Sequence, residues 1–156
     1  MSEMKIGIVG CAGRMGRMLI KQVSETNGCV VCGGTEPENS PFVGQDLGDL
    51  AGIGKAGIVV GTDTVALFEK ADAVIVTADS VNMVCEAATA GKPVFVFPLP
   101  GGNRKFKFFH QSMLEKGYTR PFDGRITLFS PPALAETTRI AALVHKSREL
   151  HQTRQG

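Results

Sequence analysis

The feature that most constrains the fold of this 156-residue chain is a glycine-rich segment near its start, residues 10–16, which reads GCAGRMG. It comes after an apolar run at 6–9 and precedes a segment in which Met15, Leu19 and Val23 recur at helical spacing. A strand, a glycine turn and an amphipathic helix in this order are typical of the first βαβ unit of a Rossmann domain. We therefore expect a pyrophosphate to bind at the turn, against the helix N-terminus.

The glycine spacing is G-x-x-G-x-x-G instead of the more usual G-x-G-x-x-G, so the interpretation depends on the residues beyond the helix. A second apolar run at 29–32 comes after a helix stop at 26–28, and Glu36 lies 20 residues beyond Gly16. An acidic side chain at the end of the second strand can accept hydrogen bonds from an adenosine ribose. The alternative interpretation is a glycine-rich turn with a solvated Glu36.

The candidate ligand is therefore NAD or NADP, and no catalytic residue and no metal ligand is assigned. The candidate cofactor-binding residues are Gly10, Cys11, Ala12, Gly13, Arg14, Met15, Glu36, Thr77 and Ala78. Glu36 would repel the 2′-phosphate of NADP and bond the free 2′-hydroxyl of NAD, whereas Arg14 could compensate from the opposite side. We expect NAD to bind at least as well as NADP.

The other apolar patterns predict one α/β domain over 1–156, a doubly wound, Rossmann-like parallel sheet of about five strands. Strands are expected at 6–9, 29–32, 58–60, 73–76 and 94–97, in the order 3-2-1-4-5. After the turn helix, further helices are expected at 64–70, 80–90, 105–116 and 133–150. The strand ends then share one edge, which the polar, glycine-rich stretch 36–57 is expected to cover or flank.

Composition limits the partners that the chain can have. The net charge of +2 is small and scattered, which argues against a nucleic-acid partner. The sequence has no apolar run of about 18 residues, so we expect no membrane partner. Residues 1–5 lack the apolar core of a signal peptide, which favours a cytoplasmic protein. A homo-oligomer stays possible.

Two further patterns suggest chemistry but have simpler explanations. Cys29 and Cys32 have C-x-x-C spacing, yet residues three apart on a strand point to opposite faces and cannot share a metal or a disulfide. The aromatic and basic run 104–110 could form a phosphate surface, but its helical spacing favours core packing. That packing leaves Phe108 for a side that a missing partner domain once covered, and gives His110 no catalytic role.

Residues 6–17, IGIVGCAGRMGR, resemble the N-terminal signature of bacterial dihydrodipicolinate reductase, an NAD(P)H-dependent enzyme of lysine biosynthesis. The similarity continues through 44–46 and 61–63 to about 71–75 and then stops. The Gly-Thr-Thr-Gly, His-His-x-x-Lys and Ser-Gly motifs of that family are missing, and Pro37 stands where the family often carries an arginine. The resemblance implies cofactor binding without the catalytic domain of the reductase.

The second half resembles a different family. It is similar to the C-terminal part of a bacterial and plant family labelled mitochondrial fission factors or predicted nucleoside-diphosphate-sugar epimerases. The segments that carry this similarity are 76–87, 91–94, 98–102 and 120–125. That family looks like a GT-B glycosyltransferase, and the resemblance places Ser80 and Glu86 beside a donor nucleotide.

We therefore interpret the chain as a chimera of a reductase-like half, 1–75, and a GT-B-like half, 76–156, joined within or near the strand at 73–76. A crossover inside a buried strand preserves side-chain alternation and helix direction, which favours an engineered chimera over a natural one. Three hypotheses remain. The chain binds a nicotinamide dinucleotide without reductase turnover, binds a nucleotide or nucleotide sugar through the Ser80 segment and 100–102, or retains no ligand.

Overall fold

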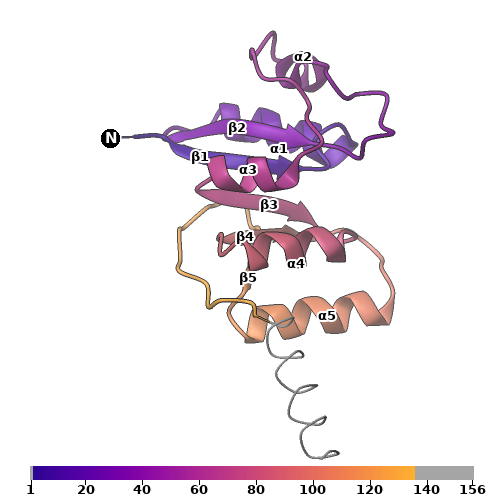
Figure 1. The fold of residues 1–156 in the computed structure, drawn as a ribbon, viewed down its shortest axis with the longest axis vertical. Coiled ribbons are helices and arrows are strands. Elements are labelled where there is room, and N and C mark those ends of the chain that lie inside the picture. The colour runs from indigo at the N-terminus through magenta and orange to yellow at the C-terminus, as the bar shows by residue number, and fades with distance from the viewer. Residues whose placement is uncertain (1, 136–156) are drawn as a thin grey trace, which may run out of the picture.

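Five parallel strands form one sheet in the structure, a computed structural model that describes residues 2–135. The strands are β1 (Met4–Val9), β2 (Cys29–Thr35), β3 (Ala73–Thr77), β4 (Val94–Phe97) and β5 (Thr119–Pro121). Their spatial order is β2-β1-β3-β4-β5 (Figure 1). The chain moves outward from β1 to β2 on one side and from β3 through β4 to β5 on the other. This arrangement confirms the doubly wound, Rossmann-like sheet, whose switch point lies between β1 and β3.

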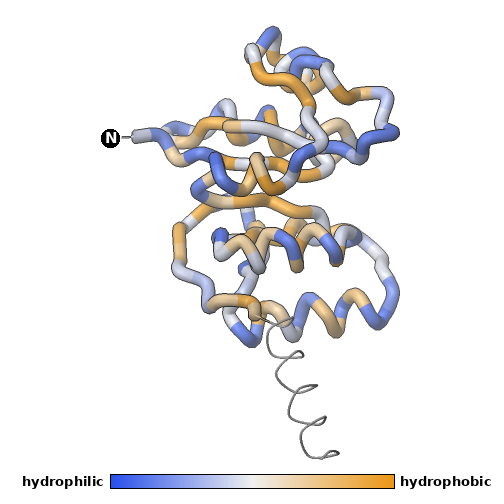
Figure 2. The backbone as a smooth tube through the Cα atoms, in the orientation of Figure 1, coloured by the Kyte–Doolittle hydropathy of each residue, from blue (hydrophilic) through white to orange (hydrophobic). Residues whose placement is uncertain are grey.

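The helices in residues 2–135 are α1 (Arg14–Ser24), α2 (Leu47–Ala51), α3 (Thr64–Lys70), α4 (Val81–Thr89) and α5 (Arg104–Glu115). Most of them pack on the two faces of this sheet, and α2 lies beyond β2 against α1 (Figure 1). Leu19, Ile20 and Val23 of α1 are buried against one face of the strands. Leu67 of α3 and Val84 of α4 are buried against the other face. Burial of both faces explains the nearly continuous apolar runs of the central strands, which Figure 2 shows in orange.

The segment after β5 covers the part of the first face that α1 does not reach. Phe122, Ile126 and Phe129 are partly buried against the same core cluster as α1. The ring of Phe129 meets the ring of Phe95 edge to face, with 5.8 Å between the centroids. Residues of an irregular segment thus take the place of a covering helix beside β4.

The structure corrects the predicted elements in two places and leaves a third largely undescribed. The run 58–60 is not a strand, because the chain around it makes only two isolated bridges, Thr35 with Gly61 and Asp46 with Val59. Gly61, just after this run, is the residue that meets the end of β2, the neighbour that the predicted order gives to a strand at 58–60. The fifth strand is instead β5, which the apolar pattern missed. The helix predicted at 133–150 falls mostly outside the described residues, and 133–135 have no regular structure.

The stretch from 36 to 61 is an excursion beyond β2, with α2 at its far end (Figure 1). Asp46 closes it, because Oδ1 accepts from the backbone N–H groups of Gly48, Asp49 and Ala56, and Oδ2 from that of Gly57. These bonds, with Ala56 the largest cause, hold the pKa of Asp46 below its ordinary value. The polar, glycine-rich stretch 36–57 therefore contains a short capped helix.

The paired cysteines lie as strand geometry predicts. Cys29 packs against the core cluster of one sheet face and Cys32 against that of the other, and neither forms a disulfide. Within 2–135, no three His, Cys, Asp or Glu side chains are arranged to hold a metal ion. No helix of this part of the chain is long and apolar enough to cross a membrane. Phe108 is 77% exposed, in line with the expectation that it faces away from the core.

Candidate functional site

The glycine turn between β1 and α1 is tightly held by the end of β2. Gly10 adopts a φ of +72°, which favours glycine, and its N–H donates to the carbonyl of Thr35 over 2.9 Å. The N–H of Cys11 donates to the same carbonyl over 3.3 Å. A Cβ atom on Gly16 would lie 2.2 Å from the carbonyl oxygen of Gly10, so only glycine lets α1 begin this close to the turn.

The first turn of α1 offers backbone donors to a ligand. Its N-cap is Gly13, which has no side chain to cap the helix, and the first turn contains no acidic residue. Within residues 2–135, the N–H groups of Arg14 and Met15 donate to no protein acceptor. The positive end of the helix dipole lies at the same place. These groups fit an anion such as a pyrophosphate.

Glu36 lies against the same turn. Its Oε1 accepts a hydrogen bond from the N–H of Ala12 over 2.7 Å, and its own N–H donates to the carbonyl of Gly61 over 3.0 Å. The side chain is thus fixed at the end of β2, beside the start of α1. One carboxylate oxygen is engaged with Ala12, which leaves Oε2 for a second donor such as a ribose hydroxyl.

Arg17 joins the turn to the excursion, which the sequence interpretation did not foresee. Its Nε donates to the carbonyl of Ala12 over 2.7 Å, and its guanidinium lies over the ring of Phe42, 5.0 Å from the centroid. Position 42 lies 25 residues away in sequence, so no local pattern could have paired the two. The contact places the excursion beside the candidate phosphate turn.

Thr77 and Ala78 lie across the switch point from the turn. They lie at the end of β3, which pairs directly with β1 through Ile8 and Ile75. The hydroxyl of Thr77 donates to Oδ1 of Asp79 over 2.6 Å, and the N–H of Ala78 donates to the carbonyl of Phe97 over 3.0 Å. Because parallel strands end at one edge, Thr77 and Ala78 share the edge of the sheet with Gly10 and Glu36.

The residues of the alternative nucleotide-sugar interpretation are not brought together in the same way. Ser80 is the N-cap of α4 but makes no side-chain capping bond. Glu86, almost two turns along this helix, accepts a hydrogen bond from the hydroxyl of Thr64 on α3 over 3.2 Å. Pro100, Gly101 and Gly102 line a cavity that neither Ser80 nor Glu86 lines.

Cys11, a candidate cofactor-binding residue, has a side chain that packs in the core and is not a nucleophile. It is completely buried, and burial, with the negative charge of Glu36 as a second cause, raises the pKa of its thiol from 9.0 to about 12. The thiol is therefore protonated at neutral pH and cannot act as a thiolate.

This shift predicts a loss of stability at alkaline pH. Between pH 9.0 and about 12 the unfolded chain has lost the Cys11 proton while the folded chain keeps it, so the free energy of unfolding falls as pH rises in that window. Below pH 9.0 this thiol should not change the free energy of unfolding. Urea melts of the wild type and Cys11→Ala from about pH 8.5 to 10.5 should show a shallower slope in the variant. Equal slopes would contradict the assignment.

Two protein families match different parts of the chain, one toward its start and the other toward its end. The sequence profile of the family described as dihydrodipicolinate reductase, N-terminus, matches residues 4–96. The profile of the family described as mitochondrial fission ELM1 matches residues 62–147. Each match covers more than half of the chain. The chain belongs to both families. The two matches overlap at 62–96, which contains the expected junction at 73–76, so the two-part composite is confirmed, while neither match bears on whether it was engineered.

Two curated reductases each match about half of the chain. The 4-hydroxy-tetrahydrodipicolinate reductase of Rhizobium meliloti is 44% identical over 75 residues, which are 48% of this chain and 31% of the relative. That of Alkalilimnicola ehrlichii is 49% identical over 71 residues, 46% of this chain and 27% of the relative. The chain thus spans about a third of the length of these relatives.

Solved structures confirm the fold. The WlbA dehydrogenase from Bordetella pertussis superposes with a TM-score of 0.55 at 15% identity, covering 76% of this chain and 34% of that one. A myo-inositol dehydrogenase from Corynebacterium glutamicum gives 0.54 at 13% identity, covering 77% and 36%. Together with the family matches, they make this chain a Rossmann-like domain of the nucleotide-binding type.

Proposed function

We propose that the chain binds NAD(H) or NADP(H) along the carboxyl edge of its sheet. The pyrophosphate would lie on residues 10–15, the adenosine ribose against Glu36, and the nicotinamide half toward Thr77 and Ala78. The observation that carries the proposal is the uncapped start of α1, whose free N–H groups lie beside a fixed carboxylate at the end of β2. When bound, the cofactor would supply hydride transfer, whereas the chain's own residues would position it.

The relatives support the same ligand. The reductase family supplies the matching turn, and the structure of the WlbA dehydrogenase was determined with NADH and UDP-GlcNAcA. The ELM1 match keeps a nucleotide sugar as the second candidate, through Ser80, Glu86 and the turn at 100–102. Titrations with NADH, NADPH and UDP-N-acetylglucosamine would distinguish the candidates, because a ligand of the native state raises the melting temperature by mass action.

Substituting Gly13 by leucine should abolish dinucleotide binding and leave the fold intact. A Cβ at position 13 meets nothing closer than the Gly10 carbonyl oxygen at 3.5 Å, and Gly13 has an ordinary φ of −68°. The added side chain would therefore stand in solvent, where the phosphates are expected. Calorimetry with NADH on Gly13→Leu measures the effect.

The matched control for Gly13→Leu is Ala90→Leu, an exposed position after α4, at the opposite edge of the sheet. It should bind NADH as the wild type does. Unchanged affinity in Gly13→Leu, with a normal melting temperature, would show that the pyrophosphate site is elsewhere.

Cofactor choice should depend on Glu36. We expect NAD(H) to bind at least as tightly as NADP(H), because the carboxylate repels a 2′-phosphate and accepts from a 2′-hydroxyl. Glu36→Gln removes the charge and should shift the preference toward NADP(H) by about tenfold. Glu38→Gln, at an exposed position two residues on, should leave the ratio unchanged. A clear preference of the wild type for NADP(H) in parallel titrations would reverse this assignment.

A further inference from the structure

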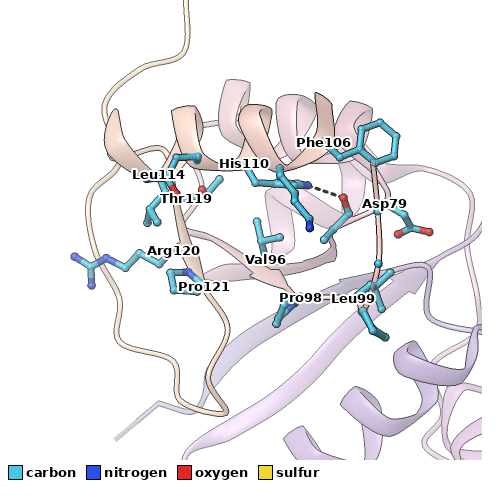
Figure 3. Close-up of a pocket in the computed structure, with 16 residues that line it drawn as sticks. Asp79, Val96, Pro98, Leu99, Phe106, His110, Leu114, Thr119, Arg120 and Pro121 are labelled. Atoms are coloured by element: carbon cyan, nitrogen blue, oxygen red, sulfur yellow. Dashed lines mark hydrogen bonds between the residues drawn. The ribbon is translucent and has the colours of Figure 1, made fainter. Parts of the chain in front are cut away.

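A cavity of about 430 Å³ lies between α5 and the carboxyl ends of β4 and β5, separate from the glycine turn. Figure 3 shows Val96 of β4 on one side of it and Leu114 and His110 of α5 on the other, with Pro98 and Pro121 also on its walls. The walls are mainly apolar. The cavity volume falls within the range of about 300–1,000 Å³ found for small-molecule sites.

The cavity lies under the start of α5, a helix that packs against the core of the sheet from Phe109 onward. Met113 is buried there, whereas Phe106 in the first half is 37% exposed. The loop 98–102 joins β4 to the first half of α5 and lines the cavity. Gly101 and Gly102 have φ values of +88° and +91°, so this loop needs glycine at both positions. The space under α5 is thus set by the backbone.

A hydrogen bond fixes the wall of the cavity that faces β3. Nε2 of His110 bonds the carbonyl oxygen of Ala78, as the dashed line in Figure 3 shows. Since a carbonyl can only accept, Nε2 carries the proton. The ring also meets the ring of Phe109 edge to face, with 5.1 Å between centroids. His110 is therefore held in one orientation.

The charged groups at the cavity favour an anion. Lys107 lines it, and this residue is exposed to solvent. The first turn of α5 contains no acidic residue. The guanidinium of Arg120 lies over the ring of Phe129, 4.3 Å from the centroid, and points away from the cavity (Figure 3). Asp79, the acidic residue among the lining residues, accepts from the hydroxyl of Thr77.

We propose that this cavity binds a small apolar carboxylate. Its apolar body would lie against Val96, Leu114 and Pro121, and its carboxylate would pair with the ammonium of Lys107 at the mouth. Apolar walls supply burial, and a single cation with a flexible stem supplies the charge preference. The glycine turn contributes no lining residue, whereas Ala78, toward which the nicotinamide half is proposed to lie, does line the cavity, so the carboxylate is titrated in the absence of dinucleotide.

The test compares 4-phenylbutyrate with its uncharged analogue 4-phenylbutyramide, each titrated into the full chain and measured by calorimetry and by amide chemical shifts. Leu114→Trp fills the cavity from a position that is 40% exposed, and Phe108→Trp is its control on the same helix, 77% exposed and outside the lining. Lys107→Gln removes the lining charge. Lys105→Gln, also on α5 but outside the lining, is its control.

We expect the wild type to bind the acid about fivefold or more tightly than the amide. Lys107→Gln should remove that difference, Leu114→Trp should prevent binding of both compounds, and the two controls and Gly13→Leu should match the wild type. Equal affinity for acid and amide in the wild type would overturn the proposal. So would unchanged binding in Leu114→Trp, or no binding of the acid up to about 10 mM.

Discussion

Replacing Gly16 by alanine is expected to destabilise the fold by about 3 kcal/mol or more, although alanine is the better helix former. The added Cβ would lie 2.2 Å from the Gly10 carbonyl oxygen and 2.6 Å from Cα of Cys11. Both atoms belong to the backbone, so no side-chain rotation relieves the contact. The turn would have to move away from α1 or lose its hydrogen bonds to Thr35.

Gly13→Ala is the matched control for Gly16→Ala, because it makes the same change three residues earlier on the same turn. Its Cβ would meet the same carbonyl oxygen at 3.5 Å, which is an ordinary contact. The midpoint of urea denaturation should fall sharply for Gly16→Ala and change little for Gly13→Ala. Similar midpoints for the two variants would mean that the close approach of α1 to the turn does not support the fold.

The sequence predicted those parts of the fold whose signals are local. The glycine turn, the helix after it and the apolar runs at β1, β3 and β4 depend on neighbouring residues, and all are found. The short strand β5 has the sequence Thr-Arg-Pro, which shows no alternation and ends in proline. A three-residue edge strand of this kind is stabilised by its pairing with β4, so its own sequence carries almost no signal.

The opposite error, at 58–60, has a related cause. Three apolar residues there have the composition of a strand, but the excursion returns to the sheet by only one bridge to Thr35. Pairing partners, and not composition, decide whether such a run becomes a strand. That the chain is one domain, with its two parts meeting between residues 75 and 76, stays a prediction.

In the candidate site, too, some features follow from local sequence and others from segments that are distant in sequence. Gly10 and Glu36 were predictable because their roles depend on position after a strand. The contact of Arg17 with Phe42, and the cavity under α5, depend on segments far apart in sequence. A pattern within a window of ten or twenty residues cannot contain them.

The largest functional effect that we expect is the absence of reductase turnover in this 156-residue chain. Hydride transfer requires cofactor and substrate to be held at reacting distance, and such positioning is worth about 7–11 kcal/mol. In residues 2–135 the single histidine, His110, bonds Ala78 through Nε2, and its Nδ1 is buried without a partner. Neither nitrogen is available to give a proton to a substrate at the sheet edge.

The measurement is oxidation of NADH in the presence of 4-hydroxy-tetrahydrodipicolinate, the substrate named for the curated relatives. We expect the rate to equal that of Gly13→Leu, in which the cofactor site is blocked, while calorimetry shows that the wild type binds NADH. Binding without turnover would place the chain's function in cofactor recognition. A substrate-dependent rate that disappears in Gly13→Leu would contradict this prediction and require a proton donor other than His110, either among the described residues or at His145 or His151 beyond them.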